Sequence, residues 1–388
     1  MKVNSNILFK NVILCFIFLY FAQGVIYESG SFIAKISLLI ILSISAIYLL
    51  KTLLRADKKP LFYWAWLFLL SINIFGFVSG GNYSGTHYSQ IKNICIAILP
   101  FFAFYYFSLK DNLQGRDLLI FSILITPIII ANFYISKIDF IDEFMVDEER
   151  VVSNIAYLFI ILIPYVFLWG EKKILAIINM LLIIFFVFQG AKRGAFILGM
   201  LGVLVFVYYQ ITSLNPKKRK IGFVVSLVGL TFLTLLIYQF YQSNEYLVER
   251  LQSIDSNTSG REIIYRNLWN NWYASDNVIN VLFGFGFVST IYYSGYGLLA
   301  HNDWLELLTN FGLIGVSSYL AVFCSIVYFL LYEKMSKEDK TILITILLIA
   351  SFQTMFSMYY TSSGTIFNAI LLGYVFGKKN RKIHNHKI

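Results

Sequence analysis

The chain has 388 residues and a formal net charge of +10; 58% of its residues are hydrophobic and only 13% are charged. Soluble domains carry about 25% charged residues, so this composition excludes an ordinary soluble protein and indicates one integral membrane domain over residues 1–388. Three cysteines lie far apart inside apolar segments, which predicts buried structural thiols and favours neither a disulfide framework nor a metal site: Cys15, Cys95 and Cys324.

Apolar segments predict an all-α polytopic membrane protein. A helix of about 20 apolar residues crosses the hydrocarbon core and satisfies its own backbone hydrogen bonds there. In chain order, twelve such crossings are predicted at 7–26, 32–50, 61–78, 91–107, 118–135, 151–170, 174–189, 195–211, 221–240, 312–332, 341–358 and 363–376. Because further crossings follow the first segment, we expect it to remain as an anchor and not to be cleaved as a signal peptide.

The basic residues predict the orientation of these crossings. With the N-terminus in the cytoplasm, more than two thirds of the 31 Lys and Arg residues fall on the cytoplasmic side, mainly in 51–60, 109–117, 171–173, 215–220, 332–340 and the basic tail 377–388. Such an excess of positive charge on cytoplasmic loops fixes orientation during insertion. We therefore expect the protein in the cytoplasmic (inner) membrane, with both termini in the cytoplasm. Because the basic residues are explained by the topology, we expect no nucleic-acid partner.

Residues 241–299, between the ninth and tenth predicted crossings, form the longest outward segment, a large extracytoplasmic loop. Long loops in compact proteins usually serve a function. Ser259 and Glu262 fit a capping box, which predicts a loop helix with Arg261 and Arg266 in its first turns. The glycines of "NVLFGFGF" predict a tight turn, and a phosphate-binding loop is the weaker alternative.

The stretch "LLAHNDWLELLTNFGLIG", residues 298–315, combines His, Asn and Asp just before a crossing. Asn302 is expected to cap a short helix that ends at Asn310 and breaks at Phe311–Gly312. His301 then lies at the outer mouth of a membrane helix, where an ordinary pKa near 6.5 suits a general base; a hydrogen bond to a loop carbonyl is the alternative. Asp303 and Glu306 are expected to be interfacial polar residues, with assistance to His301 as the alternative.

A second pair of outward charges, Lys192 and Arg193, lies between the seventh and eighth predicted crossings. We expect Lys192 to reach lipid phosphates along an extended side chain. Arg193 is predicted to be functional, because a charge near membrane depth costs roughly 2.5–3.5 kcal/mol and is seldom kept without a use.

Four of these motifs together resemble one known family. "GAKRGAFIL", "SGREIIYRNLW", "NVLFGFGF" and "AHNDWLELLTNFGLIG" are similar, in order and spacing, to motifs of the O-antigen ligase and O-antigen polymerase superfamily. The resemblance covers 190–198 and 259–315, and the remaining crossings match only in hydropathy. It implies a bundle like those of integral-membrane GT-C-like glycosyltransferases, acting without a metal or other cofactor.

The resemblance also implies an activity and partners. The donor would be an oligosaccharide on a polyprenyl diphosphate, at the outer face of the cytoplasmic membrane. The acceptor would be a second lipid-linked repeat unit, as in a polymerase of O-antigen, capsule or exopolysaccharide, or a lipid A-core sugar, as in a ligase. Polymerases are the more numerous and diverse group, which favours polymerase. Membrane lipids, a chain-length regulator and a flippase of the same pathway are the other expected partners.

The chemistry of such a transfer assigns roles to the outward residues. A departing polyprenyl diphosphate gains negative charge, which arginine stabilises through charge-assisted, bidentate hydrogen bonds. Arg193, Arg261 and Arg266 are therefore the expected diphosphate ligands, and His301 the expected base, with Asn302 and Asp303 as supporting residues. Arg266 has an alternative partner in Glu262, four residues earlier. A transporter or flippase is the rival function, but the chain has no evident internal repeat of the kind that transporters show.

Overall fold

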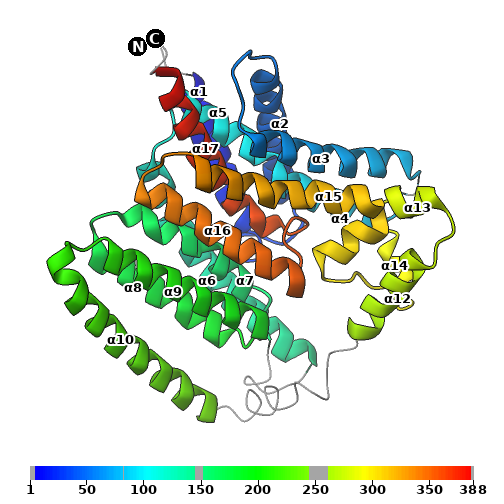
Figure 1. Cartoon of the computed structure of the whole chain (residues 1–388). Coiled ribbons are helices and arrows are strands. Elements are labelled where there is room, and N and C mark those ends of the chain that lie inside the picture. Colours follow the sequence, from blue (N-terminus) through cyan, green and yellow to red (C-terminus); the bar gives the residue numbers. More distant parts are fainter. Residues whose placement is uncertain (1–4, 82, 145–151, 244–260, 386–388) are drawn as a thin grey trace.

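The computed structural model describes residues 5–81, 83–144, 152–243 and 261–385, and every regular element in these ranges is a helix (Figure 1). This confirms the all-α fold class. The elements are α1 (Ser5–Phe21), α2 (Phe32–Leu53), α3 (Leu61–Ser79), α4 (Gly85–Ile98), α5 (Pro100–Leu109), α6 (Gly115–Phe144), α7 (Ala156–Leu162), η2 (Ile163–Trp169), α8 (Lys173–Gln189), α9 (Arg193–Thr212), α10 (Pro216–Ser243), α12 (Arg261–Tyr273), α13 (Val278–Phe283), α14 (Thr290–Tyr293), α15 (Asp303–Tyr332), α16 (Lys337–Phe356), η3 (Ser363–Thr365) and α17 (Ile366–Asn385).

The helices have the length and surface of a membrane protein. Six of them are long and apolar enough to cross a membrane: α2, α3, the continuous pair α4–α5, α6, α9 and α15. Large apolar side chains also cover the outside of the bundle, and Phe75, Ile174 and Leu331 are each 73–74% exposed. Contiguous apolar surface of this kind requires a partner, which hydrocarbon supplies in a membrane. The twelve crossings remain a prediction, since α1, α7–η2 and α8 are shorter apolar helices.

Two predicted crossings are interrupted by proline. The segment 91–107 is expected as one helix, but α4 ends at Ile98 and Pro100 begins α5. In 151–170, α7 gives way to the 3₁₀-helix η2, whose second residue is Pro164. Proline has no N–H to donate and favours the first turn of a new helix. Such irregular backbone is tolerated at membrane depth where protein surrounds it, and 72% of the residues in the most apolar stretch of α4–α5 are buried.

The prediction of buried thiols is wrong for two of the three cysteines. Cys15 on α1 and Cys324 on α15 are exposed, and Cys95 on α4 is half-buried. Apolar sequence context does not distinguish the inside of a membrane bundle from its lipid-facing surface, because both are apolar. The thiols on α1 and α15 occupy that outer surface.

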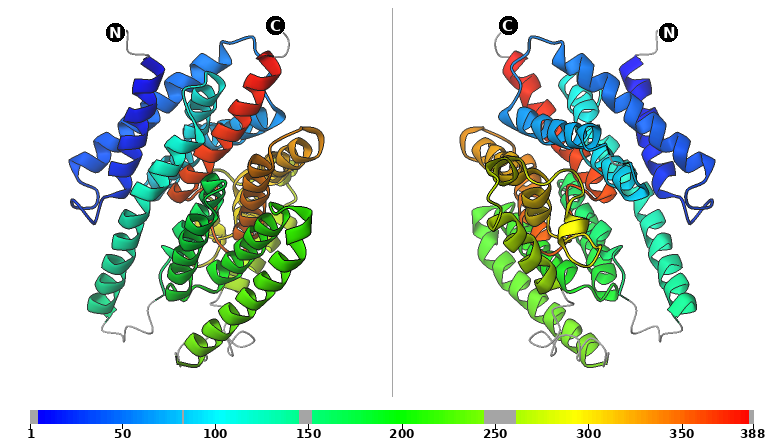
Figure 2. Two further views of the ribbon diagram at one scale, coloured as in Figure 1. Left: turned by 90° about the vertical axis from the view of Figure 1, so that its left-hand side faces the viewer. Right: turned by 90° about the vertical axis from the view of Figure 1, so that its right-hand side faces the viewer.

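The centre of the bundle is the pair α5 and α17. Nine of the ten residues of α5 are buried. Gly373 lets α17 approach closely, because a Cβ atom there would lie 2.7 Å from the carbonyl oxygen of Phe101. The start of α1 and the end of α17 lie at the same end of the molecule (Figure 2), which is the arrangement that an even number of crossings produces.

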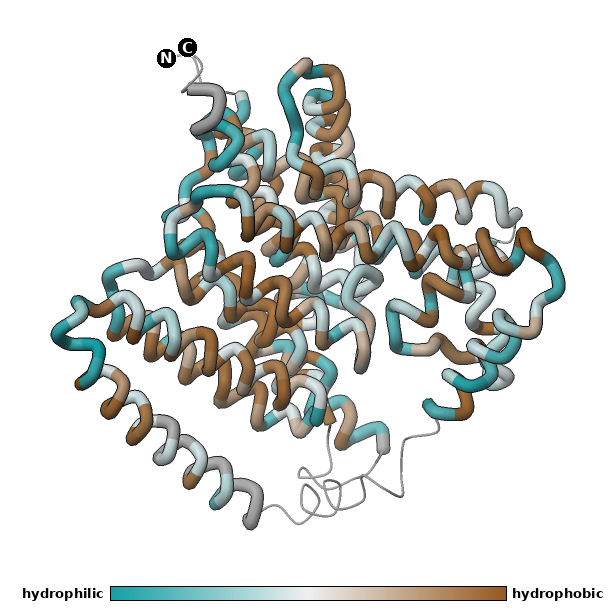
Figure 3. Tube along the Cα trace, viewed as in Figure 1, coloured by the Kyte–Doolittle hydropathy of each residue, from teal (hydrophilic) through white to brown (hydrophobic). Residues whose placement is uncertain are grey.

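Polar segments gather at two opposite sides of the bundle (Figure 3). The α9–α10 and α15–α16 connections lie on the left in this view, whereas the polar helix α12 lies on the right, with α13 and α14 beside it. Hydrophobic helices fill the space between them. The predicted site residues of the large loop and of the start of α15 therefore belong to the right-hand side.

Candidate functional site

The first turns of α15 carry the His-Asn-Asp motif as the sequence predicts. Asn302 is the N-cap, and its Oδ1 accepts hydrogen bonds from the backbone N–H groups of Trp304 (3.0 Å) and Leu305 (3.2 Å). Its Nδ2 donates to the carbonyl of Met355 at 3.3 Å, which joins the motif to the end of α16. The backbone leaves helical geometry at Gly312 (φ 59°, ψ −149°). The predicted cap and the predicted break are both confirmed.

The glycine turn at 284–286 completes this break. A helix kink leaves carbonyl groups without their usual partners. The N–H of Phe285 donates to the carbonyl of Thr309 (2.8 Å), and the N–H of Gly286 donates to that of Asn310 (3.1 Å). Gly284 and Gly286 have φ values of +73° and +107°, as a tight turn requires. The turn prediction is confirmed, whereas the phosphate-loop alternative is wrong because these N–H groups already have acceptors.

Asp303 and Glu306 are buried, so the prediction of interfacial polar residues is wrong for both. Asp303 is 0% exposed and Glu306 is 2% exposed. Oδ2 of Asp303 accepts from the hydroxyl of Tyr319 (3.0 Å) and from the backbone N–H groups of Tyr359 (2.9 Å) and Tyr360 (3.2 Å). Buried carboxylates persist only with such donors. Asp303 thereby fixes the start of α15 to the segment that follows α16.

Glu306 fixes the backbone on the other side of the motif. Its Oε1 accepts a hydrogen bond of 2.6 Å from the N–H of Ala300, which is itself fully buried. The next residue, His301, has a φ of +52°, in the left-handed region that few residues other than glycine adopt. Two anchors, Glu306 on Ala300 and the cap at Asn302, therefore flank the one histidine of the motif.

The side chain of His301 is exposed, and two cations act on it electrostatically. Partial burial of the imidazole, together with the positive charges of Arg261 and Lys192, lowers the pKa of His301 below its ordinary value. A lowered pKa keeps the ring neutral at neutral pH. A neutral, accessible imidazole has a nitrogen lone pair free to accept a proton from a bound hydroxyl group.

Arg261 begins α12, which confirms the predicted loop helix. Ser259, the other half of the predicted capping box, lies outside the described residues. Ile264 and Leu268 pack with Ala300 in a small apolar cluster and so hold α12 against the start of α15. The Arg261 side chain is within hydrogen-bonding reach of Tyr265, which also reaches Asn302. One helix face thus brings Arg261 to the His-Asn-Asp motif.

The start of α9 supplies the second cation. Lys192 is the N-cap residue and Arg193 the first residue of α9. The charge that acts on His301 from this turn is that of Lys192, whereas the Nε atom of Arg193 is buried. The N-terminus of a helix adds a partial positive charge to such a place. Lys192 therefore joins Arg261 as a cation that acts on His301, while its contact with lipid phosphates stays a prediction.

Arg266 lies apart from this group. It follows Arg261 by five residues, so the two side chains leave α12 in directions about 140° apart, and Arg266 is exposed. Across the described ranges, no ion pair joins Arg266 to Glu262. The structure thus brings five residues together, which we call the outer cluster: Lys192, Arg261, Tyr265, His301 and Asn302.

The sequence did not single out two members of the outer cluster. Lys192 has no feature that separates it from Arg193, because both lie between the same two glycines. Tyr265 is one of 27 tyrosines, and its spacing of four residues from Arg261 is the only signal that places both side chains on one helix face. No protein-family model matches the chain, and no curated protein matches its sequence.

Proposed function

We propose that the protein is a glycosyltransferase that polymerises oligosaccharide repeat units carried on polyprenyl diphosphate at the outer face of the cytoplasmic membrane. The observation that carries the proposal is the placement of two cations, Arg261 and Lys192, beside an exposed histidine of lowered pKa. Glycosyl transfer from a diphosphate needs both kinds of group, a base for the attacking hydroxyl and positive charge for the leaving group.

The reaction exchanges one bond at the anomeric carbon of the donor sugar for another. A hydroxyl oxygen of the acceptor sugar attacks that carbon, and the bond from the carbon to the diphosphate oxygen breaks. His301 accepts the hydroxyl proton, while the bonding electrons leave with the polyprenyl diphosphate. Arg261 and Lys192 bind the diphosphate oxygens as their negative charge grows. Preorganised donors in such a site contribute several kcal/mol to lowering the barrier.

The surroundings of the outer cluster support this assignment. Tyr265 and Asn302 hold Arg261 against the start of α15, so the guanidinium does not need to be ordered when substrate binds. A lipid-linked substrate also reaches an enzyme from within the bilayer, and the chain is a membrane protein with apolar helices beside the cluster. Arg193, one residue from Lys192, remains a proposed diphosphate ligand, and Asp303 a supporting residue.

Deletion of the gene, followed by gel analysis of the surface glycan, tests the proposal. We expect single repeat units in place of the long-chain ladder. Long chains that stay on the lipid carrier would instead identify the ligase, which uses the same donor and differs only in its acceptor. An unchanged glycan would overturn both, and accumulation of lipid-linked single repeat units on the cytoplasmic side would favour a flippase.

Complementation with single variants then tests the cluster itself. His301→Ala and Arg261→Gln should fail to restore the ladder at normal protein level in the membrane. Arg266→Gln is the matched control, because it removes an arginine of the same helix that points away from His301, and it should restore the ladder. Equal activity of the Arg261 and Arg266 variants would show that the cluster is not the site of transfer.

A further inference from the structure

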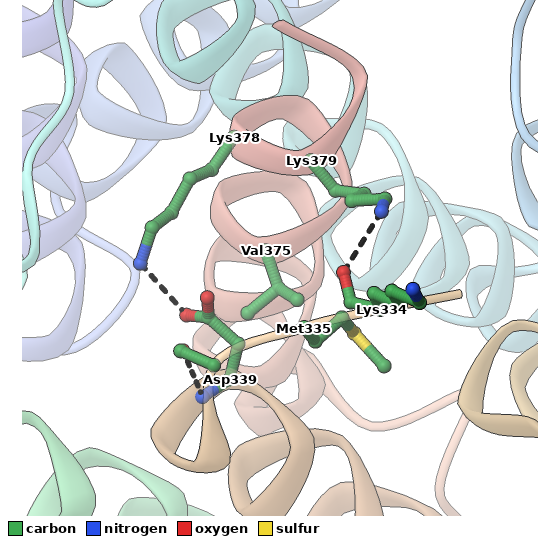
Figure 4. A pocket seen from close by; sticks show the side chains of 7 residues that line it. Lys334, Met335, Asp339, Val375, Lys378 and Lys379 are labelled. Carbon is green, nitrogen blue, oxygen red and sulfur yellow. Dashed lines mark hydrogen bonds and ion pairs between the residues drawn. The ribbon is translucent and has the colours of Figure 1, made fainter. Parts of the chain in front are cut away.

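The second polar side of the bundle contains a cavity that the proposed reaction does not use. It has a volume of about 160 Å³ and lies between the α15–α16 connection and the end of α17. Three lysines, Lys334, Lys378 and Lys379, line it together with Asp339 and the apolar side chains of Met335 and Val375 (Figure 4). Figure 1 places this connection on the side of the molecule opposite α12.

Two of the lysines are held in place. Lys378 and Lys379 extend from α17 on either side of Val375 (Figure 4). Lys378 reaches Asp339 in the first turn of α16, and Lys379 reaches Lys334 in the α15–α16 connection. The Nζ atom of Lys378 lies 3.0 Å from Oδ1 of Asp339. The Nζ atom of Lys379 lies 3.0 Å from Oε2 of Glu333 and donates to the carbonyl of Lys334 at 2.8 Å. Because these contacts already order the two ammonium groups, little side-chain entropy is lost when a ligand binds there.

The charges around the cavity favour an anion. Three lysines line it with the one carboxylate of Asp339. Two further carboxylates lie near them: Glu333 pairs with Lys379, and Glu338 interacts with Lys378. Among the residues that line the cavity itself, lysines outnumber the carboxylate, which favours a ligand with a negatively charged group such as a phosphodiester. Met335 and Val375 give the cavity an apolar wall as well. A ligand with a phosphate group and an adjoining apolar part fits both features.

The position of the cavity indicates where such a ligand comes from. It begins just beyond Tyr332, where the candidate membrane crossing α15 ends, and the ends of crossings lie at the level of the lipid headgroups. Basic pockets between membrane helices at this level bind anionic headgroups. We propose that this cavity binds the phosphate of an anionic phospholipid. The proposal rests on the membrane assignment and is independent of the proposed glycosyl transfer.

Native mass spectrometry of the purified full-length protein tests it. The protein is mixed with phosphatidylglycerol or with zwitterionic phosphatidylcholine, and lipid retention is compared with that of the Lys378→Gln, Lys379→Gln double variant. We expect preferential retention of phosphatidylglycerol by the wild type, and retention roughly tenfold weaker in the double variant, because two charge-assisted contacts are lost. Lys340→Gln is the control, since Lys340 is an exposed lysine of α16 that does not line the cavity.

Competition with inorganic phosphate separates the two sources of the group. A lipid headgroup site is supported if phosphate displaces bound phosphatidylglycerol. It is also supported if the bound lipid resists phosphate but is lost in the double variant. Binding of phosphate without any retention of lipid would overturn the lipid assignment. Equal retention of both lipids, or equal loss in the Lys340 control, would overturn the site. Single variants, Lys378→Gln and Lys379→Gln, provide the same comparison if the double variant does not fold.

Discussion

Replacement of Glu306 by alanine tests how the outer cluster is positioned. The buried carboxylate accepts a 2.6 Å hydrogen bond from the N–H of Ala300, directly before His301 in its left-handed conformation. Alanine leaves this buried N–H without its acceptor, which costs about 1–3 kcal/mol. The segment before His301 then relaxes, and the imidazole is displaced. A displacement of about 1 Å in a catalytic group lowers the rate roughly 100-fold.

The assay is glycan elongation by the purified protein on lipid-linked repeat units, with kcat and KM measured separately. We expect Glu306→Ala to lower kcat about 100-fold with little change in KM, because the carboxylate holds the base and not the substrate. Glu306→Gln is the matched control: its side-chain carbonyl still accepts from Ala300, so most of the activity should return.

Thermal unfolding of the same samples separates positioning from general instability. A variant that is folded at the assay temperature but slow supports the positioning role. The reasoning is refuted if Glu306→Ala retains wild-type kcat while His301→Ala is inactive. In that case His301 is the catalytic base, but the hydrogen bond between Glu306 and Ala300 does not position it.

Three further outcomes follow from the same contacts. Because cations lower the pKa of His301 and the neutral ring is the base, Lys192→Gln should raise that pKa and move the acidic limb of the pH profile of kcat/KM to higher pH. An unmoved limb would separate Lys192 from His301. Asp303→Ala leaves three buried donors without their acceptor and should cost about 3 kcal/mol or more of stability, measured as a lower thermal midpoint, whereas Asp303→Asn should be milder. Gly284→Ala should prevent stable expression, because the new Cβ overlaps the backbone of Asn310. Gly286→Ala in the same turn meets no atom within 4 Å and should lower the stability by only about 1 kcal/mol, because of its positive φ. Equal expression levels of the two variants would contradict the packing argument.

Local signals in the sequence were sufficient for the elements of the site. The hydrophobic segments predict helices because each needs only its own composition to be recognised. The cap at Asn302 and the break at Gly312 are also local, since a cap is defined by bonds within three residues and glycine permits the φ of +59° found there. The start of α12 near Arg261 was predicted from the same kind of local signal.

Contacts between distant segments could not be predicted from such local signals. Oδ2 of Asp303 accepts from backbone N–H groups more than fifty residues later, at Tyr359 and Tyr360. Nothing near Asp303 in the sequence distinguishes such a buried anchor from a polar residue at the membrane surface. The choice between Lys192 and Arg193 depends likewise on where α9 starts relative to His301, a relation between three separate segments.

The position of the cations strengthens the case for an anionic ligand at the outer cluster. In the predicted topology both cations lie on the outward side, where positive charge opposes the rule that otherwise orders the basic residues of this chain. Arg261 and Lys192 come from segments nearly seventy residues apart in the sequence, yet both act on one histidine. Two like charges near a third titratable group destabilise each other unless a negative charge lies between them. The diphosphate of the proposed substrate would bring such a negative charge to both cations.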